Sequence, residues 1–148
     1  MNSGKQRCLL VVEDDTGLQS QLRWSFEDYE VVIAGDRPTA IELLRRHQPA
    51  VVLQDLGLPP DATGTAEGFA TINEILAEAP HTKIIVVTGN GDRDNAVKSI
   101  GCGAYDFCSK PLDLEVLRLT VERAFRVHEL EAENRKLRSQ STATLEGI

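Results

Sequence analysis

Residues 8–15 read Cys-Leu-Leu-Val-Val-Glu-Asp-Asp, a short apolar run that ends in three carboxylates. The apolar part, Cys8–Val12, has no polar alternation, which is typical of a strand buried on both faces of a parallel sheet. Similar runs recur along the chain at Val31–Ala34, Ala50–Leu53 and Ile84–Val87, and a further strand is predicted over Tyr105–Ser109.

Longer segments with apolar residues at helical spacing separate these runs, as Leu18, Leu22 and Phe26 illustrate after the first strand. Their predicted ends carry the usual signals: proline in a first turn, proline or glycine after a last turn, and a capping aspartate. These residues are Pro38, Pro80, Gly101 and Asp113. Strands that alternate with helices imply right-handed crossovers, so the sequence predicts an α/β fold with an open, doubly wound, five-stranded parallel sheet.

Composition and charge narrow the class of protein. The chain has 148 residues, which is about one domain, and its 16 basic and 23 acidic residues give a net charge of −7. An acidic chain without a basic run is a poor candidate for binding nucleic-acid phosphates. No apolar stretch approaches the length of a membrane span, and no signal peptide is evident. Cys8, Cys102 and Cys108 show no Cys-x-x-Cys spacing and are interpreted as reduced, buried thiols of a cytoplasmic protein.

The last predicted helix is longer than the domain needs. Its pattern runs from Leu114 to about Leu137 without Gly or Pro, about 36 Å at the usual rise, and a Ser/Thr-rich tail follows from Ser139. An apolar stripe in its first half is expected to face the sheet: Leu114, Leu117, Val121 and Phe125. We therefore expect a globular domain over residues 1–125 and a helical extension with its tail over residues 126–148.

Beyond residue 125 the apolar pattern changes to a heptad. Its a and d positions are Val127, Leu130, Asn134 and Leu137. In a parallel dimer the flanking g and e positions pair Arg126 with Glu131 and Glu133 with Arg138, and an Asn at one a position fixes the register. These features favour a coiled-coil dimer, but two heptads leave open the alternative of a solvated helix whose charges only face water.

Carboxylate, hydroxyl and ammonium side chains follow four of the predicted strands. They are Glu13, Asp14 and Asp15 after the first, Asp55 after the third, Thr88 after the fourth and Lys110 after the fifth. Ligands of open α/β sheets bind at these carboxyl ends. Each residue alone is more simply a helix cap or a surface charge, but the set as a whole indicates a site. Oxygen ligands without imidazole favour Mg²⁺, and such a cluster with a lysine and a hydroxyl can hold a phosphoryl group on a carboxylate.

Four segments at these strand ends together resemble the receiver domain of bacterial response regulators, the CheY-like phosphoacceptor half of a two-component pair. They are Leu-Leu-Val-Val-Glu-Asp-Asp at 9–15, Asp-Leu-Gly-Leu-Pro at 55–59, Val-Val-Thr-Gly at 86–89 and Gly-Ala-Tyr-Asp-Phe-Cys-Ser-Lys-Pro at 103–111. The resemblance covers about residues 7–125. It implies the flavodoxin/CheY-like strand order 2-1-3-4-5, a sensor histidine kinase as partner, and a phosphorelay acceptor rather than an enzyme that acts on other substrates.

The resemblance also implies how the acidic residues are used. Asp55 matches the phosphoacceptor of the family. Mg²⁺ is expected to be held by Glu13, Asp14, Asp55 and the backbone carbonyl of Gly57. Asp15 falls outside this set and is interpreted as a helix cap.

Three further positions match the machinery that the family uses for transfer and switching. Lys110 matches the family's lysine, and its peptide bond to Pro111 is expected to be cis. Thr88 and Phe107 match the switch pair, in which the hydroxyl donates to the phosphoryl group and the ring then turns inward. This movement is expected to repack the surface of the fourth helix, fifth strand and fifth helix. For Phe107, plain core packing remains the alternative.

Two features depart from the common pattern of the family. The loop from Pro59 to Gly68 is longer than usual and is expected to overhang the phosphorylation site, where it shields the site or docks a partner. Gly57 and Asn90 carry no charge at positions that line the approach of attacking water. We expect the lifetime of the phosphoryl group to depend on these two residues.

The extended last helix is similar to the linker that joins a receiver to the ATPase of NtrC-type, sigma-54-dependent regulators. Segments 22–32, 55–61 and 128–137 are more narrowly similar to regulators of PEP-CTERM/exosortase loci. We expect a homodimer, formed through the fourth-helix/fifth-strand/fifth-helix face and the coiled coil. The resemblance implies that this dimer controls a missing carboxy-terminal sigma-54 activator module, and a stand-alone regulator that acts through protein contacts is the alternative. Only that module is expected to contact DNA, and the chain has no Gly-x-x-x-x-Gly-Lys loop for nucleotide hydrolysis.

Three other functions compete with that of a phosphoacceptor. A haloacid-dehalogenase-type phosphohydrolase also uses an Asp after a strand, but it needs a second Asp where Gly57 stands. A flavin or nucleotide binder of flavodoxin topology needs a Ser/Thr/Gly-rich phosphate loop where three carboxylates stand. A receiver-like protein-interaction module that is not regulated by phosphorylation is disfavoured by Asp55, Thr88 and Lys110, but it stays open as the alternative.

Overall fold

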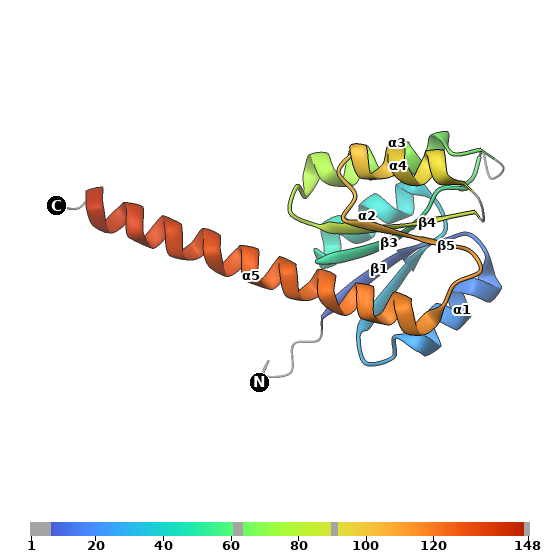
Figure 1. The fold of residues 1–148 in the computed structure, drawn as a ribbon, viewed down its shortest axis with the longest axis horizontal. Helices are drawn as coiled ribbons and strands as arrows, with labels where there is room; N and C mark the ends of the chain where they lie inside the picture. The colour runs from blue at the N-terminus through green and yellow to red at the C-terminus, as the bar shows by residue number, and fades with distance from the viewer. Residues whose placement is uncertain (1–6, 61–63, 90–91, 147–148) are drawn as a thin grey trace.

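The computed structural model describes residues 7–60, 64–89 and 92–146. Within these residues five strands alternate with five helices, as predicted (Figure 1). The elements are β1 (Cys8–Val12), α1 (Thr16–Ser25), β2 (Glu30–Ala34), α2 (Arg37–His47), β3 (Val51–Asp55), α3 (Ala66–Glu78), β4 (Lys83–Thr88), α4 (Arg93–Gly101), β5 (Asp106–Ser109) and α5 (Leu114–Glu146).

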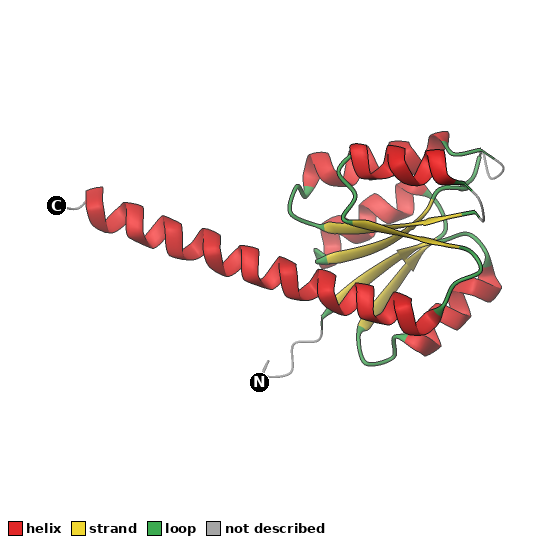
Figure 2. Cartoon of the chain, in the orientation of Figure 1, coloured by secondary structure: helices red, strands yellow, loops and turns green. Residues whose placement is uncertain are grey.

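One parallel sheet forms the centre of the molecule, in the expected strand order β2-β1-β3-β4-β5. Side chains alternate between its faces: Leu10 and Val12 pack with residues of α2 and α3, while Leu9 and Val11 pack with residues of α1 and α5. Figure 2 shows α2, α3 and α4 on one side of the sheet and α1 and α5 on the other. Because helices cover both faces, the strands read as continuous apolar runs.

Several elements end a few residues away from their predicted limits. β3 continues through Gln54 and Asp55 because the backbones of both residues pair with β4, although their side chains are polar. α4 includes Gly101, and the left-handed residue that follows the helix is Gly103, with a φ of 109°. Asp113 accepts backbone hydrogen bonds in the first turn of α5, so the predicted cap is confirmed.

Helix α5 is the longest element and projects far beyond the sheet (Figure 1). Its predicted apolar stripe is confirmed, because Leu117, Val121 and Phe125 are buried and Leu114 packs against them. The helix ends at Glu146, later than predicted, since the stretch contains neither Gly nor Pro and Ser and Thr reduce helix stability only modestly. Among the helices that the structure describes, α5 included, none is long and apolar enough to cross a membrane.

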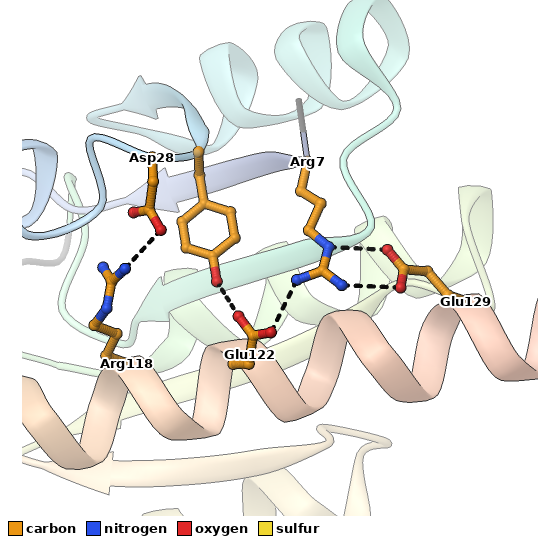
Figure 3. A network of polar contacts seen from close by, with 6 residues as sticks. Arg7, Asp28, Arg118, Glu122 and Glu129 are labelled. Atoms are coloured by element: carbon orange, nitrogen blue, oxygen red, sulfur yellow. Dashed lines mark hydrogen bonds and ion pairs between the residues drawn. The ribbon is translucent and has the colours of Figure 1, made fainter. Parts of the chain in front are cut away.

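A polar network links α5 to Arg7, the residue that precedes β1 (Figure 3). The Arg7 guanidinium lies 2.9 Å from the Glu129 carboxylate and 3.2 Å from that of Glu122. The Tyr29 hydroxyl donates to Glu122 at 2.6 Å, and the Arg7 guanidinium lies 5.4 Å from the centre of the Phe125 ring. The helix therefore keeps contact with the domain for at least one turn beyond residue 125. The division of the chain at that residue stays a prediction.

We expect Arg7→Ala to lower the free energy of unfolding by about 1 kcal/mol, because the ion pairs are partly exposed and screened by water. Urea unfolding followed by circular dichroism measures the change. Arg46→Ala is the matched control, since in the described part of the chain Arg46 pairs only with Glu42 on the exposed surface of α2. Its loss should cost at most about 0.5 kcal/mol. Equal effects of the two substitutions would contradict an anchoring role for Arg7.

Candidate functional site

The carboxyl ends of β1, β3 and β5 bring four of the predicted site residues together. Glu13 and Asp14 follow β1, and Asp55 ends β3, the strand that pairs with it. Each of these three residues offers a carboxylate oxygen within 4.8 Å of the others. The Lys110 ammonium, just after β5, lies 3.5 Å from Asp55 and 3.7 Å from Glu13. The set therefore forms one acidic pocket with a single lysine at its rim.

Burial raises the free-energy cost of keeping the carboxylates of this pocket charged. Glu13 and Asp55 are buried side by side. Burial, with repulsion by Asp55, raises the pKa of Glu13 to about 7. Burial also raises the pKa of Asp55, while Lys110 and the backbone N–H of Gly57 act in the opposite direction. One lysine does not balance three carboxylates, so the pocket favours an additional cation. Oxygen donors without imidazole or thiol fit Mg²⁺.

We expect the metal-free chain to lose stability as the pH rises from 4.5 to about 7. In the unfolded chain Glu13 loses its proton near the ordinary glutamate pKa, whereas in the folded chain it keeps the proton to higher pH. The protonated Glu13 therefore stabilises the fold fully at low pH, and this contribution is lost as the pH rises through the folded-state pKa. The loss should reach about 1 kcal/mol or more. Chemical unfolding in EDTA at several pH values measures it. Glu13→Gln should flatten this slope, and an unchanged slope in that variant would show that another group is responsible.

The two predicted switch residues lie on neighbouring strands. Thr88 ends β4 and is buried, and its hydroxyl is 3.5 Å from the carbonyl oxygen of Cys108. Phe107 of β5 is 41% exposed, so the alternative of plain core packing is wrong. The backbone N–H of Lys110 donates to the Thr88 carbonyl at 2.8 Å, which ties the lysine to the end of β4. The Lys110–Pro111 peptide bond is cis, as expected.

Three supporting residues hold the backbone of the acidic pocket. Asp15 caps α1, as predicted, and its N–H donates to the Glu13 carboxylate at 3.1 Å. The side-chain amide of Gln19 donates to the Glu13 carbonyl, and that of Gln54 donates to the Asp55 carbonyl at 2.8 Å. Sequence reasoning missed both glutamines. The signal for Gln54 was a polar residue inside an apolar strand, whereas Gln19 carries no such signal.

Two expectations fall outside the described residues, wholly or in part. Asn90, expected to line the approach of water, lies outside them. The long loop between Pro59 and Gly68 is described except for residues 61–63, so its expected position over the site stays a prediction. At the end of this loop, the Arg37 guanidinium lies 2.7 Å from the Glu67 carboxylate and links the starts of α2 and α3.

Known proteins are similar to this chain in both sequence and fold. It is 30% identical to the regulatory protein AtoC of Escherichia coli over 131 residues, 87% of this chain and 27% of AtoC. The crystal structure of NtrX from Brucella abortus matches with a TM-score of 0.81 and 28% identity, over 90% of this chain and 30% of NtrX. A CheY-like receiver domain protein from Methanospirillum hungatei matches with a TM-score of 0.76 and 26% identity, over 86% of this chain and 99% of that protein.

These matches identify the family of the chain, but the chain corresponds to only part of the larger proteins. The chain spans less than a third of the length of AtoC and NtrX. The family described as the response regulator receiver domain matches residues 9–122. Receivers of this family are phosphoacceptors that bind Mg²⁺ at an acidic pocket, interact with histidine kinases and can dimerise. The chain belongs to the family of response regulator receiver domains.

Proposed function

We propose that this chain receives a phosphoryl group on Asp55 from a sensor histidine kinase and acts as a switch rather than as an enzyme with another substrate. The observation that carries the proposal is the convergence of three carboxylates with Lys110, whose ammonium is 3.5 Å from the Asp55 carboxylate. The absence of a second Asp at position 57 disfavours the haloacid-dehalogenase alternative.

Each residue of the pocket has a role in the proposed transfer. A carboxylate oxygen of Asp55 attacks phosphorus, and the bond between phosphorus and the donor's leaving group breaks as the new bond forms. The Lys110 ammonium offsets charge on the phosphoryl oxygens. Glu13, Asp14, Asp55 and the carbonyl of Gly57 would hold Mg²⁺. When bound, the ion supplies further positive charge for the transferred group.

The proposed switch begins at Thr88. Within the described residues, the only hydrogen bond of the Thr88 hydroxyl group is the long one to the Cys108 carbonyl, so little is lost when the hydroxyl turns to a phosphoryl oxygen. Phe107 is exposed on the neighbouring strand, and space vacated by Thr88 would let its ring turn inward. The local charge change would then alter the surface of α4, β5 and α5.

Incubation of the chain with acetyl phosphate and Mg²⁺, followed by intact-mass measurement, tests the proposal. We expect a single phosphoryl adduct that does not form when EDTA replaces Mg²⁺. No adduct under either condition would favour the alternative, a receiver-like interaction module that is not regulated by phosphorylation. Continued turnover of unrelated phosphate esters would favour a phosphohydrolase.

We further propose that the chain dimerises through the α4-β5-α5 face and the α5 extension. Exposed apolar side chains on this face support the first contact: Val97, Ile100, Phe107, Val116 and Leu119. In the extension, Leu130 and Leu137 are 60% and 57% exposed and lie two helical turns apart. One feature competes with the predicted coil, because Glu131 is paired with Lys83 of its own chain at 2.7 Å.

Replacement of both Leu130 and Leu137 by Asp should weaken dimerisation of the acetyl phosphate-treated chain by more than about tenfold, since each leucine contributes roughly 1.5 kcal/mol or more when buried. Sedimentation velocity over a range of concentrations measures the change. Lys136→Asp is the control, because it alters charge at an outer position of the same helix. A wild-type chain that stays monomeric would contradict the dimer itself.

The larger output of the protein is also a proposal. Similarity to AtoC and NtrX, which are about three times longer than this chain, supports control of a sigma-54 activator module beyond the receiver. DNA would be contacted by that module and not by this chain. The narrower resemblance to regulators of PEP-CTERM/exosortase loci stays a prediction.

A further inference from the structure

Three potential metal ligands meet at the end of the sheet opposite the acidic pocket. Cys8 and Glu30 are the first residues of β1 and β2, and they are directly paired in the register of the sheet. Both lie an even number of residues before positions that face α2, so their side chains leave the sheet on the α2 side. His47 is the last residue of α2. A thiol, a carboxylate and an imidazole are therefore brought together from three elements.

The geometry of this cluster suits one ion. The Cys8 sulfur, a Glu30 oxygen and a His47 ring nitrogen all lie within 4.8 Å of one another. The His47 Nδ1 is 3.9 Å from the Glu30 Oε1. Two ligands of a tetrahedral zinc ion are about 3.4 Å apart. The His47–Glu30 pair is therefore about 0.5 Å wider than a bound ion requires, and the Glu30 side chain is exposed.

Within the described residues, the Cys8 thiol, the Glu30 carboxylate and the His47 imidazole interact with one another, and no hydrogen bond to a side chain outside the cluster holds them. A separation of 3.9 Å is too long for a hydrogen bond between His47 and Glu30. The Cys8 thiol lies against the Glu30 carboxylate, and burial together with that carboxylate raises the pKa of Cys8 to about 12. The two arginines beside His47 are already paired, Arg45 with Glu78 and Arg46 with Glu42, and do not neutralise Glu30. The adjacent carboxyl end of α2 also favours a positive charge.

We propose that Cys8, Glu30 and His47 bind a zinc ion, with water in the fourth position. Thiolate, imidazole and carboxylate together are a ligand set for zinc, whereas magnesium prefers oxygen alone. Binding replaces the thiol proton, which is released to solvent, and the sulfur lone pair enters the new bond. The ion would link the starts of β1 and β2 to the end of α2 and stabilise that edge of the domain.

Cobalt(II) is the probe, because a cobalt–thiolate bond produces a charge-transfer band in the near ultraviolet. The 148-residue chain is titrated under a reducing agent with Mg²⁺ in excess, so that the acidic pocket is filled. We expect one equivalent of cobalt to produce the band and zinc to abolish it by displacement. Cys8→Ser should remove the band, while Cys102→Ser and Cys108→Ser, the matched controls, should keep it.

Zinc affinity and stability provide the second readout. Glu30→Gln and His47→Gln should each weaken zinc binding by at least about tenfold. Saturating zinc should raise the Tm of the wild-type chain by about 5 °C or more and leave that of Cys8→Ser unchanged. His47→Gln changes a residue at the surface end of a helix, so it keeps the test valid if Cys8→Ser does not fold.

The outcomes separate this proposal from the phosphoacceptor function. Cys8→Ser should form the phosphoryl adduct from acetyl phosphate like the wild-type chain, because its site is at the other end of the sheet. A wild-type chain without a cobalt–thiolate band would overturn the zinc site, as would a band that survives Cys8→Ser. Neither result would affect the assignment of Asp55.

Discussion

Asp55→Asn reduces formation of the phosphoryl adduct from acetyl phosphate by at least about 1,000-fold, the scale expected when a nucleophile is removed. The amide has the shape of the carboxylate but no negative oxygen to attack phosphorus. Asp55 is buried beside Glu13, and burial already raises its pKa, so loss of its charge should not unfold the domain. Intact-mass measurement over time in the presence of Mg²⁺ gives the rate.

The control for this prediction is Asp15→Asn. Asp15 caps α1 through its side chain, and Asn is an equally good cap, so the variant should be phosphorylated at the wild-type rate. Undiminished labelling of Asp55→Asn would show that another carboxylate accepts the phosphoryl group. A folded but unlabelled Asp15→Asn would show that the acceptor assignment is incomplete.

Gly68→Ala should lower the free energy of unfolding by about 3 kcal/mol, at the upper end of what overpacking costs. A Cβ atom at this position would lie 2.4 Å from the Cα and the carbonyl oxygen of Leu56, and these backbone atoms cannot rotate away. The start of α3 would have to move off the segment that follows Asp55. Urea unfolding measures the loss, and Mg²⁺ affinity should fall with it because Gly57 moves as well.

Gly101→Ala is the matched control for this substitution. Gly101 is also helical, at the end of α4, and an added Cβ would meet open space. Alanine is the better helix former, so this variant should be unchanged or up to about 1 kcal/mol more stable. Similar destabilisation by the two substitutions would mean that loss of glycine flexibility, and not the contact with Leu56, is responsible.

Local patterns were enough to predict the alternation of strands and helices. The apolar runs are short and uninterrupted because helices cover both faces of the sheet, and the cap at Asp113 follows from its own side chain. The limits of β3 and α4 were less well predicted. Backbone pairing with β4 keeps Asp55 in its strand, and only a positive φ at Gly103 shows where the chain turns.

Residue type and spacing are local properties of the chain, so the chemical groups at the strand ends could be predicted without the folded structure. The sequence thereby predicted the grouping of Glu13, Asp14, Asp55 and Lys110. The pKa of Glu13 and the exposure of Phe107 could not be predicted in this way, since both depend on burial and strand order in the folded chain. The cluster of Cys8, Glu30 and His47 could not be predicted from local sequence either, because these residues come from three separate elements. They become neighbours only when the sheet and α2 pack together.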